Sequence, residues 1–95
     1  MSTTRDYIFK YRNVNPLEKL RDGEPYFFLR AQDKLSPEAV EAYSNLLKRE
    51  SDKARSEGNG ELADSLLKQA LGVLAVVNKF MDWQDDNAQY VKMPD

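Results

Sequence analysis

Aromatic and basic side chains alternate near the start of the chain, and their types suit the binding of a nucleotide. Tyr11 stands between Lys10 and Arg12, Asn13 follows, and Tyr26 lies further along. Tyr and Arg planes stack on nucleobases, whereas Lys and Arg neutralise phosphates. The pattern indicates a small nucleotide pocket. Core filling is the alternative, because six of the ten aromatic residues fall within the first thirty positions.

The alternation of side chains separates ligand candidates from core candidates. Tyr11 stands beside charged and polar neighbours, so it is the better ligand candidate. Ile8, Phe9, Phe27 and Leu29 have apolar side chains, and we expect them to fill the core.

Two further sets of charged residues could carry chemistry. Arg30 could bind an anion or serve the structure alone, and Asp33 could cap a helix or pair with a nearby cation. Asp82, Asp85 and Asp86 could in principle hold a hard cation, but they lack the loop and spacing of a calcium site. We interpret these three as a solvated acidic face and expect neither a metal nor another cofactor.

Composition excludes several functional classes. The chain has no His and no Cys, so it lacks the commonest general base, the commonest zinc ligands and the usual nucleophile pairs. Its four glycines form no phosphate-binding loop. The net charge of -2 does not favour duplex nucleic acid. The longest uncharged run, 69–78, is half the length of a membrane span, and no apolar signal segment follows Met1. We therefore predict a protein that is not an enzyme and does not enter a membrane.

The spacing of apolar residues predicts one mainly α domain over residues 1–95. Ser36, Pro37 and Glu38 form a helix start signal, and Gly58-Asn59-Gly60 is a strong breaker. A second helix is expected over 61–83, antiparallel to the first because the connection is short. We thus expect an N-terminal arm over 1–35, extended apart from a short helix over 16–21. A helical hairpin over 36–83 and a loose polar tail over 84–95 follow.

The second helix is more apolar than one partner helix requires. Between Ala70 and Val77 every residue except Gly72 is aliphatic. A helix that is apolar all round is buried all round. We therefore predict a helical homo-oligomer. The alternative is that the arm covers the extra face.

The segment over 24–37 reads EPYFFLRAQDKLSP and is followed by Val40, Tyr43 and the predicted hairpin. With its core of Glu-Pro-x-Phe-x-Leu-Arg-Ala-Gln-Asp, this stretch resembles phage anti-CBASS proteins, which sequester cyclic-nucleotide second messengers. Related phage anti-Thoeris proteins share the hairpin domain and sequester cyclic ADP-ribose signals. The resemblance covers residues 7–83.

The resemblance implies a sponge, meaning a protein that binds a messenger without cleaving it and thereby blocks activation of the CBASS effector. It implies a homohexamer, built as a trimer of dimers, in the cytoplasm of the infected bacterium. Cyclic dinucleotides such as cyclic GMP-AMP would bind between the arms of paired protomers, with Tyr11 stacking on a base. Tyr26 falls where the family is expected to have a basic pocket residue, and a Tyr there could stack instead. A separate site for cyclic trinucleotides would use Arg30 and Lys68, although Phe28 in that region is no phosphate ligand.

Other functions are compatible with the same residues. The chain could be a phage helical adaptor that inhibits a host protein by docking its hairpin, or a sponge for signals of the cyclic ADP-ribose type. A phosphodiesterase is a more distant alternative. The cluster around Tyr11 discriminates between sponge and adaptor, because an adaptor has no need for a stacking Tyr flanked by cations.

Overall fold

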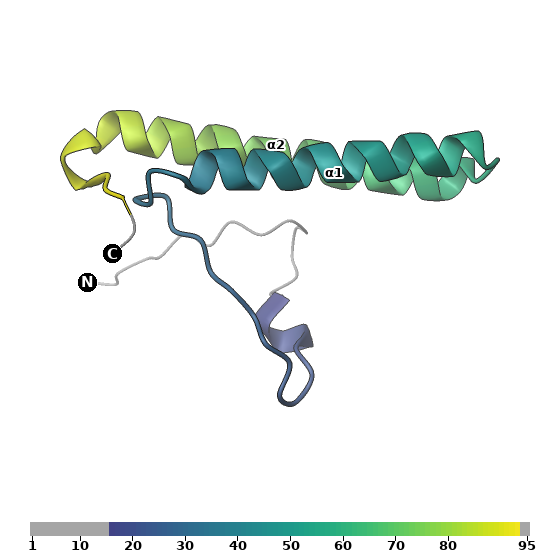
Figure 1. The fold of residues 1–95 in the computed structure, drawn as a ribbon, viewed down its shortest axis with the longest axis horizontal. Coiled ribbons are helices and arrows are strands. Elements are labelled where there is room, and N and C mark those ends of the chain that lie inside the picture. The colour runs from purple at the N-terminus through teal and green to yellow at the C-terminus, as the bar shows by residue number, and fades with distance from the viewer. Residues whose placement is uncertain (1–15, 94–95) are drawn as a thin grey trace.

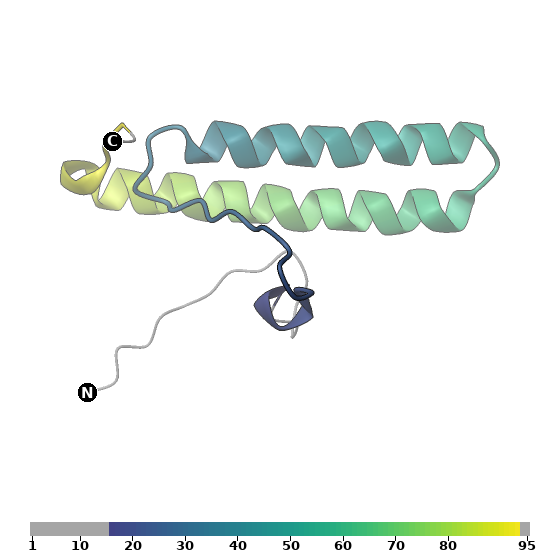
Figure 2. The same ribbon diagram turned by 60° about the horizontal axis from the view of Figure 1, so that its bottom comes forward.

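The computed structural model describes residues 16–93 and consists of two long helices, a short helix after the second of them and another short helix set apart from both (Figure 1). The elements are the 3-10 helix η1 (Pro16–Lys19), the α-helices α1 (Ser36–Ser56) and α2 (Gly60–Asp86), and the 3-10 helix η2 (Ala88–Tyr90). The long helices lie side by side and antiparallel, joined by a short turn at one end (Figures 1 and 2). The expected mainly helical fold with a helical hairpin is confirmed. No helix of the described part has the length and apolar character needed to cross a membrane.

The start of α1 follows the expected signal at Ser36 and is preceded by a turn in which Asp33 bonds to the next residues. The Asp33 carboxylate accepts a hydrogen bond from the Leu35 amide at 2.9 Å. Ser36 is the first helical residue, and its hydroxyl donates to the Asp33 carbonyl at 2.8 Å. Pro37 follows in the first turn, where its missing N–H costs nothing. Asp33 thus binds the amide of Leu35, the N-cap residue, and the expected helix cap is wrong because no side chain caps the first turn of α1.

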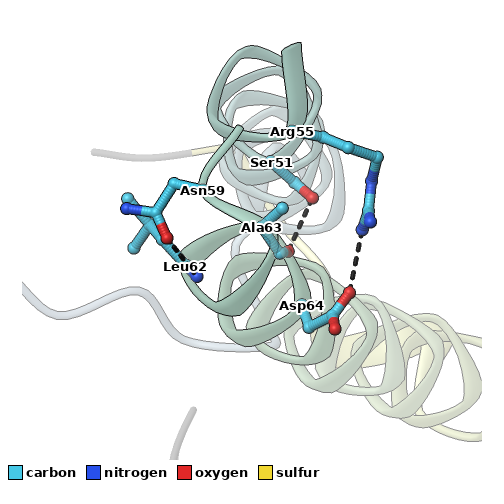
Figure 3. A network of polar contacts seen from close by, with 6 residues as sticks. All are labelled: Ser51, Arg55, Asn59, Leu62, Ala63 and Asp64. Atoms are coloured by element: carbon cyan, nitrogen blue, oxygen red, sulfur yellow. Dashed lines mark hydrogen bonds and ion pairs between the residues drawn. The ribbon is translucent and has the colours of Figure 1, made fainter. Parts of the chain in front are cut away.

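The turn between the long helices is held by backbone geometry and by a cap. Gly58 has a φ of 83°, a backbone conformation that residues with a Cβ rarely adopt. The Asn59 side chain then accepts a hydrogen bond from the Leu62 amide at 3.1 Å, as Figure 3 shows. Close by, Arg55 and Asp64 form an ion pair at 2.9 Å whose side chains are both exposed. An exposed pair of this kind contributes little, so the glycine and the cap determine where α2 begins.

Replacing Asn59 by Ala should lower the free energy of unfolding by about 1 kcal/mol, because one amide at the start of α2 loses its acceptor. Urea denaturation at one fixed protein concentration measures this change. The matched control is Asp64→Ala, which removes the exposed ion pair and should cost about half as much or less. Equal losses in the two variants would contradict the assignment of the cap.

The seam between α1 and α2 is built from small side chains. Its buried residues are Ser36, Ser44, Leu47, Ser51 and Ala54 from α1 and Ala63, Ala70, Val73 and Val77 from α2. The Ser44 hydroxyl donates to the Ala70 carbonyl at 2.9 Å, and the Ser51 hydroxyl donates to the Ala63 carbonyl at 2.7 Å. Small side chains let two helices approach closely, and these two hydroxyls find their acceptors on the opposite backbone. Leu47 is the largest of these buried side chains, with Val40 and Leu66 packed against its cluster, whereas other large apolar side chains such as Leu46 and Leu71 are exposed.

The C-terminal part of the chain corrects the expectation of a loose tail beginning at residue 84. Helix α2 continues to Asp86, and the amide and side chain of Asn87 both donate to the Trp83 carbonyl at 2.9 Å. After η2 the chain returns to the start of the hairpin. The Lys92 amide donates to the Gln32 carbonyl at 3.0 Å, and the Lys34 amide donates to the Lys92 carbonyl at 2.9 Å. The tail is therefore not loose from residue 84: residues 84–86 belong to α2, and the backbone of Lys92 pairs with Gln32 and Lys34.

The described part of the arm stands apart from the hairpin. Figures 1 and 2 both show the segment before α1 leading away from the long helices to η1. Within the described elements, η1 packs against neither long helix. It is shorter than the expected helix over 16–21, and a turn follows in which the Glu24 amide donates to the Arg21 carbonyl at 3.0 Å. The Glu24 carboxylate in turn accepts from the Arg21 amide at 3.0 Å, so this turn is held by its own residues.

Candidate ligand-binding site

The residues expected to bind a dinucleotide divide into two groups. Lys10, Tyr11, Arg12 and Asn13 lie outside the described residues, as do the core candidates Ile8 and Phe9. Tyr26 lies in the arm within the described part. The two residues expected to bind a trinucleotide, Arg30 and Lys68, are also described.

Tyr26 presents its ring to solvent. Its side chain is 61% exposed, and its ring meets that of Phe28 edge-to-face, with the centroids 5.2 Å apart and the planes at 77°. An edge-to-face contact orients two rings without stacking their faces. The pair therefore offers an aromatic surface on which a planar base could stack.

Phe27 does not fill the core, which corrects the expectation from sequence. It is 83% exposed, and Leu29 is only half-buried. The physical reason is that the arm leads away from the hairpin (Figure 1), so Phe27 has no core to enter and only Leu29 is partly covered. Residues 26–28 are instead three consecutive exposed aromatic side chains.

Arg30 lies where the arm meets the hairpin. One guanidinium nitrogen donates to the Gln32 side-chain carbonyl at 3.1 Å, and the Arg30 carbonyl accepts from the Asp33 amide at 3.0 Å. The side chain is exposed. Because a guanidinium carries five N–H donors, this single contact leaves donors that can bind an anion such as a phosphate.

Lys68 lies on the exposed side of α2, outside the seam. No hydrogen bond, ion pair or ring contact joins Tyr26, Arg30 and Lys68 to one another. A single protomer thus carries the described candidates as separate groups. A site that combined them would be completed by a ligand that bridges them or by groups from a second chain.

The three aspartates near the end of α2 form no metal centre that the structure identifies. Asp82, Asp85 and Asp86 are exposed. Within residues 16–93 there is no group of three or more His, Cys, Asp or Glu side chains that could hold a metal ion.

The bonds of Gln84 to the start of the hairpin were not expected from sequence, because the expected polar tail began at residue 84. Its side-chain amide donates to the Ala31 carbonyl at 2.8 Å and to the Asp33 carbonyl at 3.0 Å. A signal for this position was available, because Gln84 follows the buried residues Ala70 and Val77 at intervals of seven. That spacing keeps a side chain on the same face of a helix.

In comparisons with known proteins, no protein-family model, curated protein or solved structure matches the chain.

Proposed function

We propose that this protein binds cyclic oligonucleotide messengers and sequesters them without cleaving them, as a phage protein that blocks CBASS effectors in an infected bacterium. The observation that carries the proposal is the segment over 24–37, which resembles the anti-CBASS proteins. Its exposed Tyr26 and Arg30 supply a stacking ring and a phosphate ligand on one arm.

The chemistry of the ligand suits the residues of the arm. A cyclic dinucleotide presents two bases and two phosphates, so a two-fold pocket between protomers can offer each recognition group twice. Tyr11 stacks on the bases, Lys10 and Arg12 neutralise the phosphates, and Asn13 and Tyr26 complete the pocket. A cyclic trinucleotide would use Arg30 and Lys68 in a second site.

The same proposal includes a homohexamer, arranged as a trimer of dimers. It is supported by the outward position of large apolar residues on the hairpin: Leu46 on α1 and Leu62, Leu67, Leu71 and Met81 on α2 are all exposed. The seam buries none of these five side chains, so they remain available to a second copy of the chain.

Calorimetric titration tests the proposed function directly. The panel contains cyclic GMP-AMP, other cyclic dinucleotides, cyclic trinucleotides and cyclic ADP-ribose, with linear dinucleotides of the same bases as controls. We expect saturable binding of a cyclic dinucleotide and no comparable binding of its linear form. Binding of cyclic ADP-ribose alone would assign the protein to the sponges for cyclic ADP-ribose signals. No binding of any ligand would refute the proposal.

Bound ligand should be recovered chemically unchanged. The chain has no His and no Cys, and so lacks the commonest groups for attacking a phosphodiester. Cyclic GMP-AMP is incubated with the protein for hours, released by heat or protease, and identified by chromatography and mass spectrometry. A sample without protein is the control. The appearance of linear dinucleotide or mononucleotides would show that the protein is a phosphodiesterase and not a sponge.

A helical adaptor that docks on a host protein is the second candidate. The exposed leucines that support an oligomer favour it equally, because another protein could cover them. The adaptor predicts that substitutions on α2 abolish function while Tyr11→Ala has no effect. The sponge predicts the loss of nucleotide binding in Tyr11→Ala.

A further inference from the structure

The start of the hairpin is tied to the end of the chain by a set of four hydrogen bonds, here called the clasp. Gln84 donates from its side chain to the carbonyls of Ala31 and Asp33, at 2.8 and 3.0 Å. Lys92 donates to Gln32 at 3.0 Å and accepts from Lys34 at 2.9 Å. Asp33 and Lys92 consequently form a parallel bridge. The clasp therefore binds all of residues 31–34 to the C-terminal part of the chain.

We infer that the clasp fixes the direction in which the arm leaves the hairpin and that Gln84 is thereby a positioning residue for the ligand-binding arm. The inference rests on the proposed function for its effect on affinity, whereas its structural part is independent of any ligand. Gln84 touches no proposed ligand group and acts through the segment that carries Arg30 and Tyr26.

The position of the clasp in the chain supports this role. Residues 31–34 directly follow Arg30, and only Leu35 separates them from α1, so the chain before Arg30 is attached to the hairpin through them. η1 packs against neither long helix, so it supplies no second anchor among the described elements. Arg30 is itself linked to the clasped segment by its contact with Gln32 at 3.1 Å.

Gln84 is suited to this task by its two side-chain donors. A single amide nitrogen reaches two carbonyls that lie two residues apart, which holds the chain in its bend before α1. Gln84 is partly buried, so water replaces its lost bonds less readily than at an exposed position. Removing its donors leaves the Ala31 carbonyl without the partner it has in the structure.

Site-directed spin labelling tests the structural part. The chain has no Cys, so the double variant Phe27→Cys and Lys53→Cys carries labels only on the exposed arm and on exposed α1. Labelled chains are diluted into unlabelled protein, so that pulsed electron resonance reports distances within one chain. We expect Gln84→Met to broaden the distance distribution, while the matched control Gln89→Met leaves it unchanged. Gln84→Lys should restore a narrow distribution, because an ammonium group can donate to both carbonyls.

A second variant removes one of the two Lys92 bonds of the clasp without changing a long helix. Lys92→Pro removes the N–H that donates to Gln32, and the preceding Val91 already has the extended backbone that a following proline favours. Hydrogen exchange of the Lys34 amide should accelerate at least tenfold in both Gln84→Met and Lys92→Pro. Helical content by circular dichroism should stay at the wild-type level.

Affinity for cyclic GMP-AMP completes the test. We expect about a tenfold loss in Gln84→Met, with recovery in Gln84→Lys and no loss in Gln89→Met. If wild-type protein binds no cyclic nucleotide, the proposed function fails and the spin-label distances still decide whether the clasp directs the arm. If wild-type protein binds and Gln84→Met binds equally well, or if its distance distribution stays narrow, the inference about Gln84 is overturned.

Discussion

Tyr11→Ala should abolish most of the affinity for cyclic dinucleotides while leaving the hairpin folded. Stacking of one base on an aromatic side chain contributes about 1–3 kcal/mol in single-stranded nucleic-acid binders. The proposed two-fold pocket would use Tyr11 from both protomers, so one substitution would remove two stacks. The expected loss is about 2–6 kcal/mol if the two copies act independently.

Calorimetric titration and thermal melting must be measured on the same Tyr11 variants. Tyr11→Phe keeps the ring and should retain most of the affinity. Tyr90→Ala is the matched control, since Tyr90 is an exposed tyrosine of η2 at the far end of the chain. If Tyr11 fills a core instead, its replacement by Ala should lower the melting temperature as much as the affinity. Unchanged affinity in a folded Tyr11→Ala variant would place the pocket elsewhere.

The neighbouring cations should respond to salt in a way that Tyr11 does not. Lys10→Ala and Arg12→Ala remove charge attraction to phosphates, and salt screens such attraction. Their losses of affinity should therefore shrink as the salt concentration rises. The loss caused by Tyr11→Ala should change much less, because stacking does not depend on net charge.

The hairpin was predictable from sequence because its signals are local. A breaker around Gly58, a start signal around Ser36 and apolar residues at helical spacing each act within a few residues. The structure places α1 over Ser36–Ser56 and begins α2 at Gly60, close to the expected bounds.

The clasp and the exposed aromatic residues were not predictable in the same way. Gln84 pairs with residues more than fifty positions away in the chain, and no local pattern reports which carbonyls a glutamine will meet. Phe27 has a large apolar side chain, as many core residues do, but its environment depends on whether the arm lies on the hairpin. The binding role of Tyr11 stays a prediction, because Tyr11 lies outside the described residues and a pocket between two arms would depend on how two copies of the chain meet.

Leu71→Glu should dissociate the proposed homohexamer without unfolding the hairpin. Leu71 is 56% exposed in one protomer, whereas Val73, two residues later, is only 4% exposed in the seam. The apolar stretch over 70–77 thus serves two faces, and Val73 belongs to the contact with α1. A charge buried without a partner destabilises its surroundings by about 3–5 kcal/mol, so each substitution should disrupt the contact that its position serves.

Leu71→Glu and Val73→Glu should therefore differ in the property that each loses, which is the oligomer for the first and helical content for the second. Leu71→Glu should lower the mass in light scattering at micromolar concentration toward that of one 11.0 kDa chain, with its helical circular dichroism retained. Val73→Glu should lose helical content, because its carboxylate would face α1. Ala42→Glu is the charge control, since it adds the same charge at an exposed position of α1. A wild-type protein that is already a monomer, or a Leu71→Glu variant of unchanged mass, would show that the outer leucines of α2 do not join copies of this chain.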